Sequence, residues 1–341
     1  MDRSEILEDL KKLLEQNNTN TIIADFIDSE SAVNQLLQNR NKNKELCQPT
    51  LFENLDKNFN GGLVPGLYIL GALPSLGKTT FALQIASNLC KGGSEVLFCN
   101  LEMSAEELIA KRISRFTYEV CKEENYDYTK NAKTESAVSR GVFLNVEDNK
   151  LRKIEEEVLN KAIEYAKNES GFYIAWQEPP ISAVTIEDIE DIVETFIAEH
   201  NRPTLIIDYL QIIKPKDDYK SDKSNVDTIV STLKRISGKY KIPVIAISSL
   251  NRQNYKVEVN LASFKESGSI EFGGDVLLGM QLKGQGEKGF KLGEAMNEDP
   301  RQIIVKILKN RKGGGVYKGI LYDYYPKFNY FEEKYELNNN E

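Results

Sequence analysis

From residue 50 onward, short apolar runs alternate with longer stretches in which apolar residues recur at helical spacing. The short runs fit buried strands, and the longer stretches fit helices that cover a sheet. Their alternation predicts an α/β fold, with a mostly parallel central sheet and helices on its faces. The expected strands lie at residues 67–70, 96–99, 204–207, 243–247, 276–282, 302–308 and 316–322.

Several of these elements have recognisable ends. The helix after the first strand is expected to stop at Gly92-Gly93, and Thr185 suits the N-cap of a later helix. A Gly-rich turn at 309–315 separates the last two strands, so this pair is predicted to form a C-terminal β-hairpin.

Residues 1–48 have a different character from the rest of the chain. They are polar, and their apolar residues fall at helical spacing in two stretches: Ile6, Leu10, Leu13 and Leu14, then Ile23, Phe26, Val33, Leu36 and Leu37. Two interpretations are open, a helical cap packed on the core and a helical arm that docks on a neighbouring subunit. Pro49 marks the boundary, so we expect a short helical N-terminal extension over 1–48 and one domain over 49–341.

Composition narrows the class of protein. Apolar residues make up 40% of the 341 residues, enough for a buried core, and the net charge of −8 means that any nucleic-acid contact must come from local basic clusters. The single histidine, His200, argues against a His-based metal site, and the four cysteines contain no Cys-x-x-Cys pair. No apolar run approaches the roughly 18–20 residues that span a bilayer, and no signal-peptide pattern is visible. We therefore expect a cytoplasmic enzyme without membrane contact.

The strongest chemical signal is a Gly-Lys-Thr sequence between the first strand and its helix. This context is that of a phosphate-binding loop, whose N–H groups wrap nucleotide phosphates. Lys78 would reach the β- and γ-phosphate oxygens of ATP, and Thr79 would bind Mg²⁺. Ala72 stands where the strict pattern has glycine, a variant that is acceptable if its φ angle is negative. The residues expected to surround the nucleotide are Ala72, Leu73, Pro74, Ser75, Leu76, Gly77, Lys78, Thr79 and Thr80.

Two acidic residues follow predicted strands. Asp208 ends the strand at 204–207, the place of a carboxylate that serves a Mg²⁺ ion beside a phosphate loop. Glu102 follows the strand at 96–99, where it can orient the water that attacks the γ-phosphate or, alternatively, start a helix near Ser104.

An ordered set of motifs resembles one known family. It comprises Gly-Ala-Leu-Pro-Ser-Leu-Gly-Lys-Thr-Thr at 71–80, Leu-Glu-Met at 101–103, Ile-Asp-Tyr-Leu-Gln at 207–211, Leu-Asn-Arg at 250–252, Lys-Glu-Ser-Gly-Ser-Ile-Glu at 265–271 and Lys-Asn-Arg at 309–311. Together they are similar to the C-terminal ATPase domain of DnaB-family replicative helicases, a RecA-like P-loop NTPase fold. The resemblance covers roughly residues 50–331 and extends to the helicase halves of phage and mobile-element primase–helicases.

The resemblance implies roles for individual residues. Glu102 matches the water-activating glutamate, and Lys309 and Arg311 match a lysine and an arginine finger that reach the nucleotide of the neighbouring subunit. Lys265, Glu266 and Gly268 match a loop that follows single-stranded DNA through the pore of a ring hexamer. The implied cofactors are ATP and Mg²⁺, and the implied partners are single-stranded DNA, other copies of the chain, and primase or other replication proteins.

The chain departs from the family in two places. Ser249 stands where relatives usually have a glutamine that senses the γ-phosphate, so coupling to DNA is expected to be rerouted, water-mediated or weak. The N-terminal collar domain is expected to be absent, because residues 1–48 are too short for it. Three functions therefore stay open: a helicase, a RecA-like DNA-dependent ATPase that does not unwind, and a nucleotide-switched regulatory ATPase. Hexamer, filament and monomer stay open too.

Overall fold

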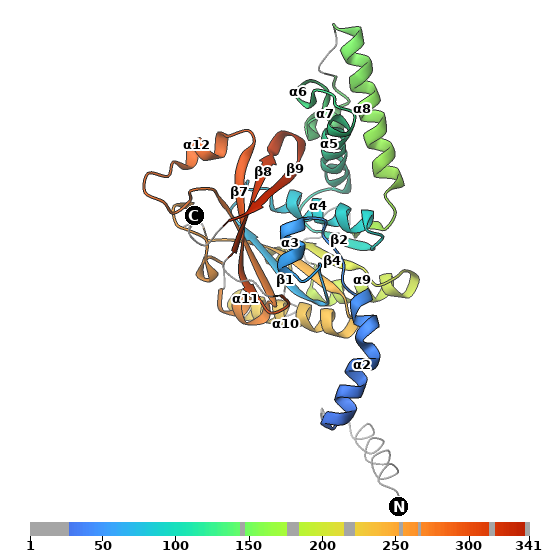
Figure 1. The fold of residues 1–341 in the computed structure, drawn as a ribbon, viewed down its shortest axis with the longest axis vertical. Helices are drawn as coiled ribbons and strands as arrows, with labels where there is room; N and C mark the ends of the chain where they lie inside the picture. Colours follow the sequence, from blue (N-terminus) through green and yellow to red (C-terminus); the bar gives the residue numbers. More distant parts are fainter. Residues whose placement is uncertain are drawn as a thin grey trace, which may run out of the picture. The chain divides into compact units, whose positions relative to one another are not determined.

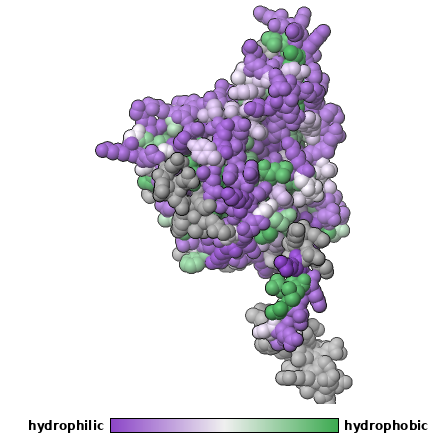
Figure 2. Space-filling model, viewed as in Figure 1, coloured by the Kyte–Doolittle hydropathy of each residue, from purple (hydrophilic) through white to green (hydrophobic). Residues whose placement is uncertain are grey.

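The computed structural model describes residues 27–143, 147–175, 184–214, 222–251, 255–264, 267–313 and 318–337. The chain divides into two units, residues 1–45 and 46–341. The first contains helix α2 (Ser29–Glu45), on which Val33, Leu36 and Leu37 are exposed, so that apolar side chains gather on its surface (Figure 2). The earlier apolar positions predicted to be helical, Ile6 to Phe26, lie outside the described residues.

The described part of the second unit is built on a nine-stranded sheet in the order β3-β2-β4-β5-β1-β6-β7-β8-β9 (Figure 1). Strands β3 to β6 in this order are parallel, as predicted, whereas β6 to β9 are joined in antiparallel fashion. The parallel strands are β1 (Gly66–Ala72), β2 (Val96–Asn100), β3 (Phe172–Ala175), β4 (Thr204–Asp208), β5 (Pro243–Ser249) and β6 (Val276–Leu282). The antiparallel strands are β7 (Arg301–Asn310), β8 (Lys318–Tyr325) and β9 (Tyr330–Glu336).

Helices cover both faces of this sheet. Helix α4 packs on one face of the central strands, and α10 packs on the other with α9 and α11 beside it (Figure 1). Helices α5 to α8 form a separate group in which α5 packs against α6, α7 and α8. The helices are α3 (Glu53–Asn58), α4 (Lys78–Lys91), α5 (Ala105–Glu123), α6 (Tyr128–Asn131), α7 (Glu135–Arg140), α8 (Asn149–Asn168), α9 (Ile186–Glu199), α10 (Asp222–Tyr240), α11 (Ser267–Gly273) and α12 (Leu292–Asn297), with short 3-10 turns η1 (Leu210–Ile212), η3 (Leu261–Ser263) and η4 (Pro326–Phe328).

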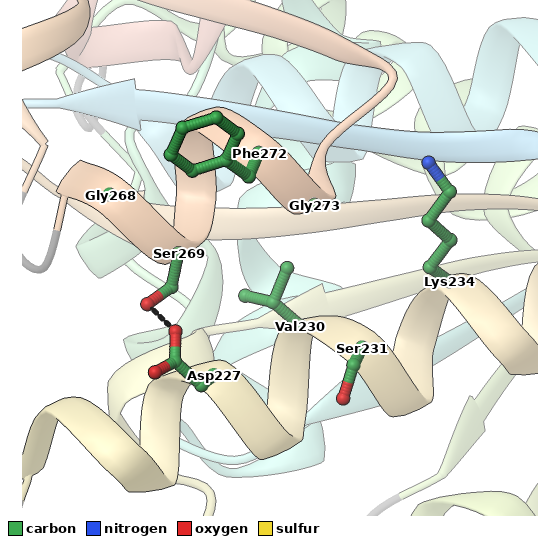
Figure 3. A pocket seen from close by; sticks show the side chains of 8 residues that line it. All are labelled: Asp227, Val230, Ser231, Lys234, Gly268, Ser269, Phe272 and Gly273. Atoms are coloured by element: carbon green, nitrogen blue, oxygen red, sulfur yellow. Dashed lines mark hydrogen bonds between the residues drawn. The ribbon is translucent and has the colours of Figure 1, made fainter.

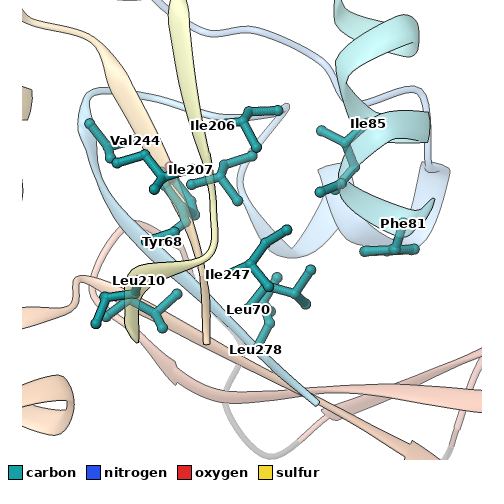
Figure 4. Packing of buried hydrophobic residues seen from close by; sticks show 14 of the residues in the cluster. Tyr68, Leu70, Phe81, Ile85, Ile206, Ile207, Leu210, Val244, Ile247 and Leu278 are labelled. Atoms are coloured by element: carbon teal, nitrogen blue, oxygen red, sulfur yellow. The ribbon is translucent and has the colours of Figure 1, made fainter. Parts of the chain in front are cut away.

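The main core lies between the parallel strands and α4. Phe81 and Ile85 of α4 face apolar side chains of the central strands, among them Ile207 and Ile247 (Figure 4). The strands are buried along their whole length, which explains why the sequence shows them as continuous apolar runs rather than alternating ones. This core fixes the carboxyl ends of the strands relative to the first turn of α4.

The predicted fold class is confirmed, including the β7–β8 hairpin and the helix ends. The helix α4 ends at Gly92, and Thr185 caps α9 by accepting a hydrogen bond from the backbone N–H of Asp188. Residues 316 and 317 of the last predicted strand lie outside the described residues. Within the part of the chain that the structure describes, no helix is long and apolar enough to cross a membrane, and Cys47, Cys90, Cys99 and Cys121 are free thiols.

Candidate active site

The loop between β1 and α4 is shaped by two residues with left-handed backbone. Ser75 has a φ angle of 65° and Gly77 one of 83°. Gly77 also lies so close to Tyr324 that a Cβ atom would come within 2.8 Å of the ring, so this position requires glycine twice over. Leu73 and Leu76 are buried and anchor the loop, while Pro74 and Ser75 are exposed at its tip.

The loop leaves the N-terminus of α4 open to an anion. No side chain caps the first turn of α4, and no acidic residue occupies it. Such a helix end offers unpaired N–H groups and a positive dipole to phosphate oxygens. Ala72, the variant position, is the last residue of β1 and does not have the positive φ that would require glycine. The Thr80 side chain is buried and contacts Asn329 at 3.4 Å.

Lys78 folds back over the mouth of the loop. Its Nζ lies 3.5 Å from the carbonyl oxygen of Ala72 and 3.3 Å from Oγ of Ser249. Ser249 is the last residue of β5 and pairs with Ala72 in the parallel register, which explains how it comes to lie beside the loop. The ammonium group is therefore held at the edge of the sheet where the phosphates of a nucleotide would lie.

Thr79 and Asp208 meet at the same edge. The Thr79 hydroxyl donates to Oδ2 of Asp208 at 2.6 Å, and the other carboxylate oxygen, Oδ1, is buried without a hydrogen-bond partner among the described residues. Burial raises the pKa of the Asp208 carboxyl to about 6, although the hydrogen bond from Thr79 opposes this shift. A buried carboxylate oxygen without a partner, next to a hydroxyl, fits a divalent cation such as Mg²⁺, which prefers oxygen ligands.

Glu102 projects from a turn that its neighbours hold in place. The backbone N–H of Leu101 donates to the carbonyl oxygen of Asp208 at 3.0 Å, which places the turn beside the end of β4. On its other side the turn leads into α5, whose N-cap Ser104 forms a capping box with Glu107. The Glu102 side chain is exposed, so it faces solvent close to the Thr79–Asp208 pair. Its carboxylate contributes to the raised pKa of Asp208.

Lys309 and Arg311 lie at the opposite end of the sheet from the loop. The N–H of Arg311 donates to the carbonyl oxygen of Asp275 at 2.9 Å, and the N–H of Asp275 donates to that of Leu67, near the start of β1, at 2.8 Å. The loop begins at the other end of β1, at Ala72, five residues further on, which is about 16 Å along a strand. The structure therefore does not bring these two cations to the loop of their own chain.

The two cations also differ from each other. The Lys309 ammonium donates to the carbonyl oxygens of Glu271 and Gly274, the latter at 2.7 Å, and burial lowers its pKa. The Arg311 side chain is exposed. Lys309 thus ties β7 to the end of α11, while Arg311 extends from the surface.

The predicted DNA-facing residues are only partly described. Lys265 and Glu266 lie outside the described residues, as does Arg252 of the Leu-Asn-Arg motif. Gly268 lies in α11, where an added Cβ would meet no atom within 4 Å. Gly268 belongs to the same end of the sheet as Lys309, not to the loop.

Sequence reasoning missed two residues that contact the loop or its neighbour. Arg301, at the start of β7, donates through Nη1 to the carbonyl oxygen of Ser75 at 2.7 Å and so braces the loop tip. Gln211 donates to Oγ of Ser248 at 2.8 Å and accepts from the N–H of Ser249 at 3.3 Å, which joins the ends of β4 and β5. Gln211 belongs to a quoted motif, whereas Arg301 stands in no motif and is 226 residues from Ser75.

Comparison with known proteins identifies relatives over most of the chain. A protein-family model described as DnaB-like helicase C terminal domain matches residues 47–333. The replicative DNA helicase DnaB of Geobacillus stearothermophilus is 28% identical over 293 residues, which cover 84% of this chain and 57% of the relative. The replicative DNA helicase DnaB of Rickettsia bellii is 31% identical over 242 residues, covering 66% of this chain and 42% of the relative. The chain thus spans about half the length of these relatives.

Two solved structures share the fold. One, an ATPase domain solved on its own, superimposes with a TM-score of 0.69 at 22% identity, covering 90% of this chain and 99% of that one. The other, a DnaB-like replicative helicase solved in a study of its interactions with primase, superimposes with a TM-score of 0.68 at 21% identity over 96% of this chain and 71% of that one.

Proposed function

Because the chain belongs to the family of DnaB-like helicase C-terminal domains, we propose that it is an ATP-driven helicase that moves along single-stranded DNA during replication. The curated relatives in this family are named replicative DNA helicases. The chain would act in the cytoplasm, where four free thiols are stable. Primase or another replication protein would be a further partner.

The nucleotide site would be formed by the loop 72–80 and the strand ends beside it. Lys78 and the N-terminus of α4 would hold the phosphates, and Thr79 and Asp208 would hold Mg²⁺. The ion would neutralise phosphate charge when bound. Glu102 is the only carboxylate of the predicted site that is exposed at this edge, so it would accept the proton of the attacking water.

One observation carries the proposal further: Arg311 lies about five strand residues away from the loop of its own chain, near the start of β1. A cation at this position can approach a bound nucleotide only if that nucleotide belongs to another copy. An arginine supplied across an interface stabilises the charge that develops on the transferred phosphoryl group. We therefore propose that hydrolysis takes place between subunits, in a ring hexamer.

DNA would pass through the centre of this ring. Lys265, Glu266 and Gly268 would follow its backbone, with six copies of Lys265 concentrating positive charge on the axis despite the net charge of −8 per chain.

The experiment that tests this function is ATP hydrolysis by the whole chain with and without single-stranded DNA. We expect hydrolysis to rise with oligonucleotide concentration, for unrelated base sequences alike, and to fall again as salt is added. The Lys78→Ala variant should show neither basal nor stimulated hydrolysis. Hydrolysis that ignores DNA at low salt would contradict the helicase and favour a nucleotide-switched regulatory ATPase.

A further inference from the structure

Phe272, near the end of α11, is the most exposed large apolar side chain among the described residues, with 77% of its surface accessible. It stands over a groove of about 500 Å³ between α10 and α11 (Figure 3). The walls of the groove are Asp227, Val230, Ser231 and Lys234 of α10 and Gly268, Ser269 and Gly273 of α11. An exposed phenylalanine beside a hollow is a surface that a partner can cover.

The exposure of Phe272 does not come from a loosely attached helix. Gly273 packs so closely on α10 that a Cβ atom there would lie 2.1 Å from Cγ1 of Val230. Ser269 donates a hydrogen bond to Asp227 across the groove (Figure 3). The Lys309 ammonium binds the carbonyl oxygens of Glu271 and Gly274, which flank Phe272 on both sides. The ring is therefore presented to solvent by a fixed support.

The same support carries Arg311. Lys309 binds next to Phe272, Arg311 follows two residues later, and the N–H of Arg311 donates to the carbonyl oxygen of Asp275, three residues after Phe272. Residues 271–275 thus hold the phenylalanine and the arginine in one rigid piece. A neighbour that approaches Arg311 closely enough to place its nucleotide there also approaches Phe272.

The charges of the groove favour a protein over a nucleic acid as its occupant. Asp227 contributes a negative charge, and the only groove cation among the described lining residues, Lys234, is paired with Asp275 at 3.1 Å. A polyanion would gain little from this surface, because nucleic-acid binding depends on unneutralised basic groups.

We propose that Phe272 and the α10–α11 groove form part of the contact between neighbouring copies of this chain, so that a second copy covers Phe272 when Arg311 reaches its nucleotide. This inference rests on the proposed function, since it takes Arg311 to act across an interface. It adds an apolar anchor to that interface, and aromatic anchors commonly contribute a large share of binding energy.

A photo-crosslinking residue at position 272 identifies the occupant. The whole chain carrying p-benzoylphenylalanine at 272 is irradiated with Mg²⁺, a non-hydrolysable ATP analogue and labelled single-stranded DNA. The matched control carries the same group at Tyr335, an aromatic residue of β9 that is 48% exposed. We expect covalent dimers of the chain from position 272 and none from 335. Crosslinks from 272 to DNA, or no dimers although the protein is assembled, would overturn the inference.

Assembly gives a second readout. Phe272→Glu should raise the protein concentration for half-assembly, measured by mass photometry, at least about tenfold, whereas Tyr335→Glu should leave it unchanged. Both variants should melt within a few degrees of the wild type and bind a fluorescent ATP analogue equally well as isolated chains. Equal assembly of Phe272→Glu and wild type would overturn this inference alone. A wild type that never assembles would also overturn the proposed composite site.

Discussion

The hydroxyl of Thr79 lies 2.6 Å from a carboxylate oxygen of Asp208, although 129 residues separate the two positions in the chain. This contact joins the first turn of α4 to the end of β4 and buries Asp208 almost completely. The carboxylate keeps one oxygen without a hydrogen-bond partner in the described structure. The pair is thus arranged at the expense of stability, and this has measurable consequences.

Replacing Asp208 by asparagine should make the metal-free protein more stable at high pH. Because burial raises the pKa of Asp208 to about 6, the folded state holds the proton more tightly than the unfolded state, whose pKa is about 3.9. The free energy of unfolding of the wild type therefore falls as the pH rises from about 4 to about 6. Asp208→Asn should exceed the wild type by up to about 3 kcal/mol above pH 6, and the difference should shrink toward pH 4.

Urea unfolding in EDTA from pH 4 to pH 8 measures this difference directly. Added Mg²⁺ with a nucleotide should stabilise the wild type more than Asp208→Asn, since only the wild type keeps the carboxylate ligand. A stability difference that does not change with pH would show that Asp208 does not titrate as described.

Lys78 is expected to hold the nucleotide. Lys78→Ala should weaken the binding of a fluorescent ATP analogue at least about tenfold, or about 1.4 kcal/mol, and abolish hydrolysis, because the ammonium at the mouth of the loop is lost. Lys91→Ala is a matched control: Lys91 ends the same helix and pairs with Glu119 on the surface. Similar affinities for the two variants would contradict the role given to Lys78.

Glu102→Gln should separate binding from chemistry. The amide cannot take a proton from water, so hydrolysis should fall by about 10² to 10⁴ while ATP stays bound. Rapid-quench measurements of a single turnover, combined with equilibrium binding, distinguish the two steps. Lost affinity with normal turnover would mean that Glu102 serves binding instead.

Arg311 is expected to act on the nucleotide of a neighbouring copy. Arg311→Ala alone should slow hydrolysis by about 10³ to 10⁵. When Arg311→Ala and Glu102→Gln chains are mixed, some junctions combine an intact Glu102 with an intact Arg311, and activity should partly return. The amount recovered should follow the mixing ratio once exchange of subunits is verified. Activity that stays flat across all ratios would indicate that Arg311 does not work across an interface.

The parts of the fold and site that the sequence predicts are those written in contiguous residues. The loop 72–80, the strand ends at Glu102 and Asp208, and the strand–helix alternation all depend on local pattern. Helices α6 and α7 and strand β3 were not predicted, because elements of four to six residues are too short to show a period. Strand β9 was also missed, since Glu and Lys residues interrupt its apolar positions at the sheet edge.

Long-range contacts account for the remaining gaps. Arg112 and Arg115 are buried in α5, where Arg112 pairs with Glu169 and stacks over Phe172, so the core face of this helix looks polar in the sequence. The bracing of Ser75 by Arg301 depends on the sheet having formed. The distance of Arg311 from its own loop likewise follows from the register of β1, β6 and β7 and from no local motif.

Strand displacement tests the central claim most directly. Forked DNA substrates with 5′ or 3′ single-stranded tails are incubated with the assembled wild-type chain, Mg²⁺ and ATP, and release of the labelled strand is followed over time. The account predicts release on one tail polarity, dependent on ATP hydrolysis and absent in Lys78→Ala and Glu102→Gln. DNA-stimulated hydrolysis without strand release on either substrate would contradict the helicase and support a RecA-like ATPase that does not unwind.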